Sequence, residues 1–162
     1  MELPYAENVN YWQTSQTSPD SWIDKTKKLL EGFGGNVLVE AFGNEPTSGH
    51  AAFMLLFEIE GDKFKVIWPV LTSQSGKERA ARIQAATLLY HDVKAKCLTA
   101  RVFGARRAFF QYWQLPDGRA ASDLAGPELL QAIPALFLPG PSSPTGPTGE
   151  TGDVVEGEAT IL

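Results

Sequence analysis

Metal-binding and disulfide-forming residues are scarce in this chain of 162 residues, which has one cysteine, Cys97, and two histidines, His50 and His91. A single cysteine excludes a disulfide within the chain, and these residues cannot supply the full Cys and His ligand set of a zinc site. A chain of this length buries roughly two-thirds of its unfolded surface on folding. The sequence therefore predicts one domain built around a hydrophobic core, with no metal ion and no cofactor.

Long apolar runs are also missing. The longest run, residues 51–57, holds seven residues, whereas a membrane-spanning helix needs about 20. The first residues, Met1–Tyr5, have neither the basic nor the apolar region of a secretory signal. These features predict a cytoplasmic protein that has no membrane partner.

Basic residues are absent from residues 120–162, which carry six acidic residues. Residues 1–60 are also acidic, with a net charge of −6, whereas residues 61–119 hold eleven basic and four acidic residues. Since binding follows the local field rather than the total charge of −5, the central block predicts affinity for a polyanion. The alternative is that folding intersperses these charges and leaves the block as a solvated face.

A helix followed by three strands is expected after an irregular arm, residues 1–17. Ser18 supplies a hydroxyl N-cap, Pro19 occupies the first helical position, and glycines beyond residue 31 end the helix. The strands are expected over residues 36–42, 51–60 and 63–68, which are rich in Val, Leu, Ile and Phe. Gly61-Asp62 is expected to form the hairpin turn between the last two strands.

A long central helix is expected to follow, because Ser75 and Glu78 have the spacing of a capping box. The helix is expected to run to Cys97 or as far as Phe103, with Gly104 as its stop. Its apolar residues form two stripes on opposite sides of the helix. A helix that is apolar on two sides needs a second cover, either the C-terminal segment or a second copy of the chain.

The C-terminal part is expected to contain a strand over residues 106–115 and a short helix from residue 126. The predicted fold class is therefore α+β, in a single domain over residues 18–138. Residues 139–162 consist largely of Gly, Pro, Ser, Thr and acids and predict a disordered tail. Its acids are a candidate mimic of nucleic acid at the basic block, and the alternative is an inert solubilising tail.

A set of catalytic residues is not evident in the sequence. His50 stands at a loop-to-strand junction and His91 within the central helix, and Cys97 lies on an apolar helix stripe. Residues 74–77, Gln-Ser-Gly-Lys, end like a phosphate-binding loop but lack its first glycine and the hydroxyl residue after the lysine. The sequence therefore predicts a protein without enzymatic activity.

Cations and aromatic residues follow one another closely over residues 77–113, a combination that suits nucleic acid. Cations contact phosphates, and flat rings stack on unpaired bases. The expected strand at 106–115 carries Phe109 and Trp113 on one face, in the core, and Phe110 and Tyr112 on the other. The predicted nucleic-acid-binding residues are Lys77, Arg79, Arg82, Lys94, Lys96, Arg101, Arg106, Arg107, Phe110 and Tyr112.

The expected order of helix, three strands and helix over residues 19–97 resembles that of double-stranded-RNA-binding domains. Residues 75–88, SGKERAARIQAATL, are similar to the lysine- and alanine-rich helix opening of that family. Residues 48–53 are similar to its loop histidine and following phenylalanine. The resemblance implies a basic helix start that lies across phosphates after a three-stranded sheet. Single-strand annealing proteins of recombination systems share such a core of three strands and a helix.

Residues 11–119 also resemble small uncharacterised proteins of phages and mobile elements, through YWQTS at 11–15 and LLEGFGG at 29–35. The predicted function is that of a non-enzymatic nucleic-acid-binding protein of such an element, acting through residues 77–107. DNA or RNA and single or double strands stay open. The alternative is a protein-interaction module, in which the second apolar stripe and the sheet residues Met54 and Leu56 form a homo-oligomer.

Overall fold

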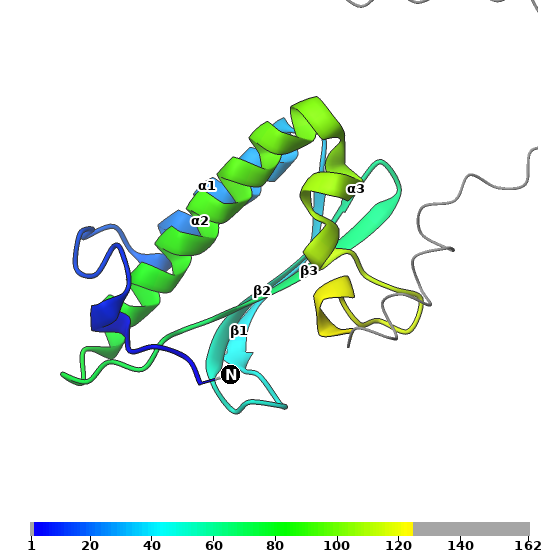
Figure 1. Cartoon of the computed structure of the whole chain (residues 1–162). Helices are drawn as coiled ribbons and strands as arrows, with labels where there is room; N and C mark the ends of the chain where they lie inside the picture. The colour runs from blue at the N-terminus through cyan, green and yellow to red at the C-terminus, as the bar shows by residue number, and fades with distance from the viewer. Residues whose placement is uncertain (1, 125–162) are drawn as a thin grey trace, which may run out of the picture. The chain divides into compact units, whose positions relative to one another are not determined.

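The computed structural model describes residues 2–124, which lie in the first of two compact units of the chain, residues 1–126. The expected short helix from residue 126 and the expected tail at 139–162 lie outside the described residues. The first unit is α+β, with two long helices and a three-stranded antiparallel sheet (Figure 1). The expected order of helix, three strands and helix is confirmed.

The sheet has the strand order β1-β2-β3, with β1 at Asn36–Asn44, β2 at Ala51–Ile59 and β3 at Asp62–Pro69. Side chains of β2 alternate between the two faces, as extended backbone requires. One row is buried, while Met54 and Leu56 on the opposite face are half-exposed. The buried row consists of Phe53, Leu55, Phe57 and Ile59.

The turn between β2 and β3 lies one residue earlier than expected. Glu60 and Gly61 form it, since Ile59 pairs with Asp62 in the ladder. Both turn residues have positive φ, 53° for Glu60 and 84° for Gly61. Such a turn matches the twist of a hairpin, and glycine occupies its second position at no steric cost. The expected Gly61-Asp62 turn was wrong because Asp62 already pairs with Ile59 as the first residue of β3.

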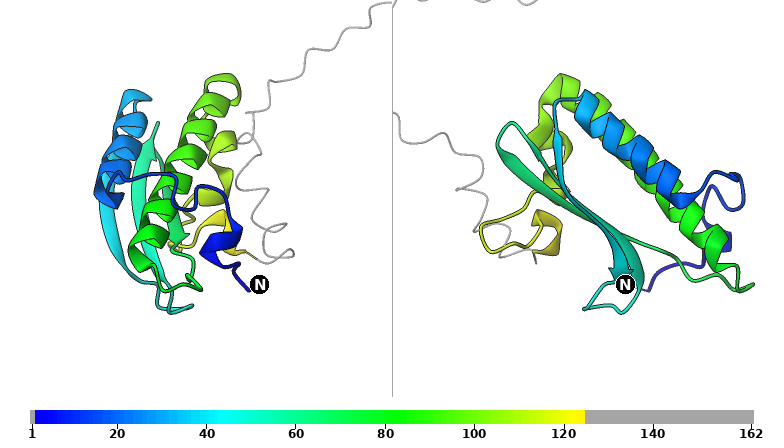
Figure 2. Two further views of the ribbon diagram at one scale, coloured as in Figure 1. Left: turned by 90° about the vertical axis from the view of Figure 1, so that its left-hand side faces the viewer. Right: turned by 180° about the vertical axis from the view of Figure 1, so that it is seen from behind.

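Both long helices cover the same face of the sheet and lie side by side (Figures 1 and 2). Helix α1 spans Pro19–Gly32, and its N-cap Ser18 accepts a hydrogen bond from the Ser21 N–H at 3.2 Å, as the sequence predicts. Helix α2 spans Glu78–Phe103 and ends at Gly104, whose φ of 87° confirms the expected stop. The first turns of the two helices are neighbours, so the helices run parallel.

The expected capping box at the start of α2 is not formed. The N-cap is Lys77, which makes no side-chain capping bond, and the hydroxyl of Ser75 instead donates to Glu7 at 2.8 Å. Glu7 also accepts hydrogen bonds from Ser73 and from the backbone of Gln74. Because α2 begins at Glu78, Ser75 does not occupy the N-cap position, and its hydroxyl is oriented toward a carboxylate distant in sequence.

The expected strand at 106–115 was also wrong. In the described part of the chain these residues form a short helix, α3, at Ala105–Ala108 and a 3-10 helix at Phe110–Tyr112, followed by isolated bridges. Helical turns place Phe109, Tyr112 and Trp113 on one side, and all three are buried. A strand would have divided them between two faces. A further 3-10 helix spans Ala121–Asp123.

The core is centred on three fully buried aromatic rings, Phe57 of β2, Phe64 of β3 and Phe109. Their ring centroids are 5.4–5.6 Å apart in each pair. Aromatic pairs at such separations add to the stability that burial of their area provides. The segment after α3 is therefore fixed to the sheet by Phe109, which sequence reasoning placed in the core correctly.

The N-terminal arm is part of the domain, with a 3-10 helix at Ala6–Asn8. The buried side chain of Gln84, on α2, holds it by donating to the carbonyl oxygens of Ala6, Val9 and Asn10 at 2.8–3.0 Å. The ring of Tyr11 stacks on His91 of α2, with centroids 4.7 Å apart. A single amide thus bonds to three carbonyl oxygens of the arm and ties them to α2.

We expect Gln84→Leu to lower the free energy of unfolding by about 1–3 kcal/mol, because it leaves buried carbonyl groups without a donor. Urea denaturation measures this change, and limited proteolysis should show faster cleavage within the arm. Gln74→Leu is the matched control, since the Gln74 side chain is exposed. Equal stability of Gln84→Leu and the wild type would contradict the anchoring role.

Candidate nucleic-acid interface

The predicted basic residues divide into a paired set and an unpaired set. Lys96 forms an ion pair with Asp92 at 2.6 Å, and Arg106 forms a two-bonded pair with Asp62 at 3.0 Å. The other six are exposed and form no ion pair with a residue in the described range. These unpaired cations are Lys77, Arg79, Arg82, Lys94, Arg101 and Arg107.

The paired cations hold the segment after α2 in place. Asp92 accepts hydrogen bonds from Lys96 and from the Tyr112 hydroxyl, both at 2.6 Å. The guanidinium of Arg106 also lies over the Trp113 ring, 4.4 Å from its centroid. Both cations therefore have structural partners that would have to be given up before they could contact a phosphate.

The two aromatic residues predicted to contact bases, Phe110 and Tyr112, do not lie on the face of a strand as expected. Tyr112 is buried, and its burial together with the hydrogen bond to Asp92 raises the pKa of Tyr112 above its ordinary value. Phe110 is half-buried, with its ring edge-on to Trp113 at 6.3 Å between centroids. The face of Tyr112 is thus unavailable to a stacking base, because helical turns replace the expected strand.

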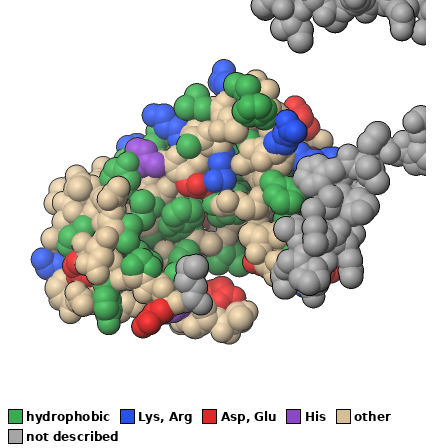
Figure 3. Space-filling model, in the orientation of Figure 1, with side chains coloured by type: hydrophobic (Ala, Val, Ile, Leu, Met, Phe, Trp, Pro, Cys, Tyr) green, Lys and Arg blue, Asp and Glu red, His purple; other side chains and the backbone are tan. Residues whose placement is uncertain are grey.

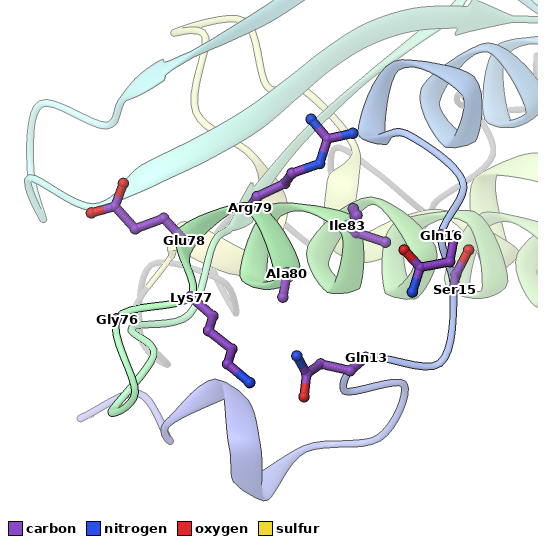
Figure 4. Close-up of a pocket in the computed structure, with 9 residues that line it drawn as sticks. All are labelled: Gln13, Ser15, Gln16, Gly76, Lys77, Glu78, Arg79, Ala80 and Ile83. Carbon is purple, nitrogen blue, oxygen red and sulfur yellow. The ribbon is translucent and has the colours of Figure 1, made fainter.

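Three of the unpaired cations, Lys77, Arg79 and Arg82, gather at the start of α2 beside two hollows. The arm hollow has a cavity volume of about 510 Å³. Its lining includes Gln13, Ser15 and Gln16 from the arm and Lys77 and Arg79 from α2. Figure 4 shows Lys77 and Gln13 pointing toward one another across the hollow, while Glu78 points away from Lys77.

The aromatic hollow adjoins the arm hollow and has a cavity volume of about 410 Å³. Glu78 and Arg79 line both hollows. The lining of the aromatic hollow combines the first turns of α1 and α2 with two rings from the sheet. The lining residues are Ser18, Pro19, Asp20, Phe42, Phe53, Glu78, Arg79 and Arg82.

A stacked pair at the aromatic hollow was missed by sequence reasoning. The Arg82 guanidinium lies over the Phe42 ring, 4.8 Å from its centroid, and Phe42 also contacts Phe53 at 4.8 Å. Phe42 is 43% exposed because it lies near the end of β1, beside the first turns of the helices. The register, which pairs Phe42 with the buried Phe53, is the signal that places it on the helix-covered face.

The opposite end of α2 is apolar. Leu98, Val102 and Phe103 are 61%, 75% and 59% exposed. Figure 3 shows hydrophobic side chains interspersed with Lys and Arg side chains on this face of the molecule, toward the end of α2. The second apolar stripe is therefore covered near the start of α2, where Ala81 is buried, and uncovered near its end.

The described residues offer little for metal or thiol chemistry. No group of three or more His, Cys, Asp or Glu among residues 2–124 is placed to hold a metal ion, and no helix there is long and apolar enough to cross a membrane. Cys97 is buried as expected from its stripe, and burial raises the pKa of the Cys97 thiol. A raised pKa leaves the thiol protonated and unreactive.

Glu7 ties the arm to the loop that precedes the cations at the start of α2. Hydrogen bonds from Ser73, Gln74 and Ser75 favour the charged carboxylate and lower the pKa of Glu7 from 4.5 to about 2. A lowered pKa means that the ionised group stabilises the fold at a pH above 4.5. That contribution is lost as the pH falls through the range from 4.5 toward 2.

We expect Glu7→Gln to be less stable than the wild type near neutral pH, and the difference to vanish as the pH approaches 2. Urea denaturation of both proteins at several pH values measures this. Glu2→Gln, which changes an exposed acid of the same arm, controls for the loss of charge. A difference in stability that does not change with pH would contradict the assignment to the ionised Glu7.

Comparison of the chain with protein-family models, with curated proteins and with solved structures gave no match in any of the three.

Proposed function

We propose that the protein binds nucleic acid without catalysing a reaction on it, and that the start of α2 is the main contact surface. The observation that carries this proposal is the group of unpaired cations, Lys77, Arg79 and Arg82, beside two hollows. A cation that forms no ion pair is more readily available to a phosphate than one already bonded to a carboxylate. The net charge of the whole chain is −5, so binding depends on this local field.

Three further cations extend the surface along the molecule. Lys94 and Arg101 lie on α2 and Arg107 on α3, and all three are exposed. A nucleic acid that contacts both groups would follow α2 along its length. The paired residues Lys96 and Arg106 stay outside the proposed surface, since their carboxylate partners already neutralise them.

We expect the triple variant Lys77→Ala/Arg79→Ala/Arg82→Ala to bind nucleic acid at least tenfold more weakly at low salt. The slope of log affinity against log salt should also flatten by about one for each phosphate contact removed. Fluorescence anisotropy with single-stranded and double-stranded DNA and RNA at several salt concentrations measures both quantities.

The matched control is Lys25→Ala/Lys28→Ala/Lys63→Ala, which removes three exposed lysines from α1 and β3 and changes the net charge equally. This control should bind nearly as the wild type does. Failure of the wild type to bind any of the four probes at low salt would overturn the proposal. An equal loss in both triple variants would contradict the location of the surface.

A second candidate function, self-assembly, is favoured by the apolar end of α2. Leu98, Val102 and Phe103 are the three most exposed large hydrophobic residues in the described range. Leu98 and Val102 are one helical turn apart, so they present a continuous apolar surface. Contiguous exposed apolar surface of this kind is typical of protein interfaces.

We expect the wild type to form oligomers through this surface and Leu98→Ser/Val102→Ser to be a monomer. Light scattering coupled to size exclusion over a range of concentrations measures the mass. Thr99→Ser, an exposed position on the same turn, should leave the mass unchanged. A wild type that is monomeric at every concentration would overturn this second candidate and leave the nucleic-acid proposal standing.

A further inference from the structure

We propose that the aromatic hollow holds one unpaired nucleobase with an exocyclic amino group, so that the protein prefers single strands containing cytosine to duplexes and to oligo(dT). This inference rests on the proposed function and specifies the ligand of the same site. It depends on three features of the hollow, which are a stacked platform, a pair of carboxylates and the position of Arg79.

The platform is the Arg82–Phe42 stack. A guanidinium plane and an aromatic ring are both surfaces on which bases stack. Here the guanidinium carbon of Arg82 lies 4.8 Å from the centroid of the Phe42 ring. Phe53 contacts the Phe42 ring and limits its movement. Only an unpaired base has a free face to offer to such a platform, because the bases of a duplex are stacked on one another.

The carboxylates are Asp20 of α1 and Glu78 of α2, which line the aromatic hollow with Arg79 and Arg82. Neither carboxylate forms an ion pair with another described residue. Carboxylates repel phosphates, but they accept hydrogen bonds from an exocyclic amino group such as N4 of cytosine. Thymine and uracil present a carbonyl oxygen at that position and cannot make this bond.

Arg79 lies between the aromatic hollow, which is proposed to hold the base, and the arm hollow, along which the phosphates are proposed to lie. Its side chain lines both hollows, and Figure 4 shows it extending toward the start of α1, away from Lys77. A base in the aromatic hollow therefore has one guanidinium beside its own phosphate. The strand that leaves the hollow passes next to Lys77 and the amide of Gln13 in the arm hollow.

The test measures the affinities of the full chain for oligo(dC), oligo(dT), oligo(rC) and a mixed-sequence DNA duplex of equal length, at one salt concentration. The wild type should bind oligo(dC) at least fivefold more tightly than oligo(dT) or the duplex. Comparison of oligo(dC) with oligo(rC) tests whether the sugar contributes to binding. Equal affinities for oligo(dC) and oligo(rC) are expected, since the hollow contacts the base.

Phe42→Leu should weaken binding of oligo(dC) by about fivefold to a hundredfold, the range for removal of a stacking ring, and leave the duplex affinity unchanged. Tyr5→Leu removes an exposed ring from the N-terminal arm, outside both proposed surfaces, and should have no effect. Asp20→Ala/Glu78→Ala alters two exposed positions, and its ratio of oligo(dC) to oligo(dT) affinity should fall to about one.

The inference is overturned if the wild type binds the duplex as tightly as oligo(dC) while the cation triple variant still loses affinity, a result that leaves the proposed function intact. It is also overturned if the oligo(dC) preference survives in Asp20→Ala/Glu78→Ala, whether or not Phe42→Leu folds. Failure of every probe to bind at low salt overturns the inference and the proposed function together.

Discussion

The rest of the structure depends on one row of side chains of β2, which are all buried on the same face of the sheet. These residues are Phe53, Leu55, Phe57 and Ile59. Because the sheet has one strongly apolar face, both long helices must cover that face, and they lie on it side by side (Figure 2). Each helix reaches it from the same end of the sheet. Their first turns therefore meet beside Phe42, near the end of β1.

Charge pairing decides which cations of the central block are available to a ligand. Lys96 and Arg106 are held by carboxylates and aromatic rings, so they stabilise the packing of the segment after α2. The predicted binding residues without an ion pair lie at the start of α2, at Lys94 and Arg101 further along it, and at Arg107 on α3. A block with a net positive charge in the sequence is thus divided into cations that hold the fold together and cations that are accessible.

The two ends of α2 differ in chemistry, although they belong to one helix. The start has cations, carboxylates and the Phe42 ring around hollows, which suits a polar ligand with a flat apolar part. The end has exposed Leu98, Val102 and Phe103, which suit another protein surface. The two proposed roles, nucleic-acid binding and self-association, therefore depend on different side chains of α2.

Sequence patterns predicted those elements whose signals are local. Alternating apolar residues predicted the three strands, Ser18 and Pro19 predicted the start of α1, and Gly104 predicted the end of α2. The expected core positions of Phe109 and Trp113 were also correct. Each of these depends on backbone geometry or on a nearby side chain, and such preferences act in almost any context.

Tertiary contacts decided the rest, because they outweigh local preference. The hydroxyl of Ser75 donates to Glu7, and α2 begins at Glu78 rather than from a capping box at Ser75. The core holds Phe109, Tyr112 and Trp113 on one side of their segment, which requires helical turns in place of a strand. Pairing of Lys96 and Arg106, and the stacking of Arg82 on Phe42, join residues separated by other elements. The sequence by itself determined the order of helix, three strands and helix and the basic character of α2. Only the folded chain decided which cations are unpaired and which ring lies beside them, since both depend on partners distant in sequence.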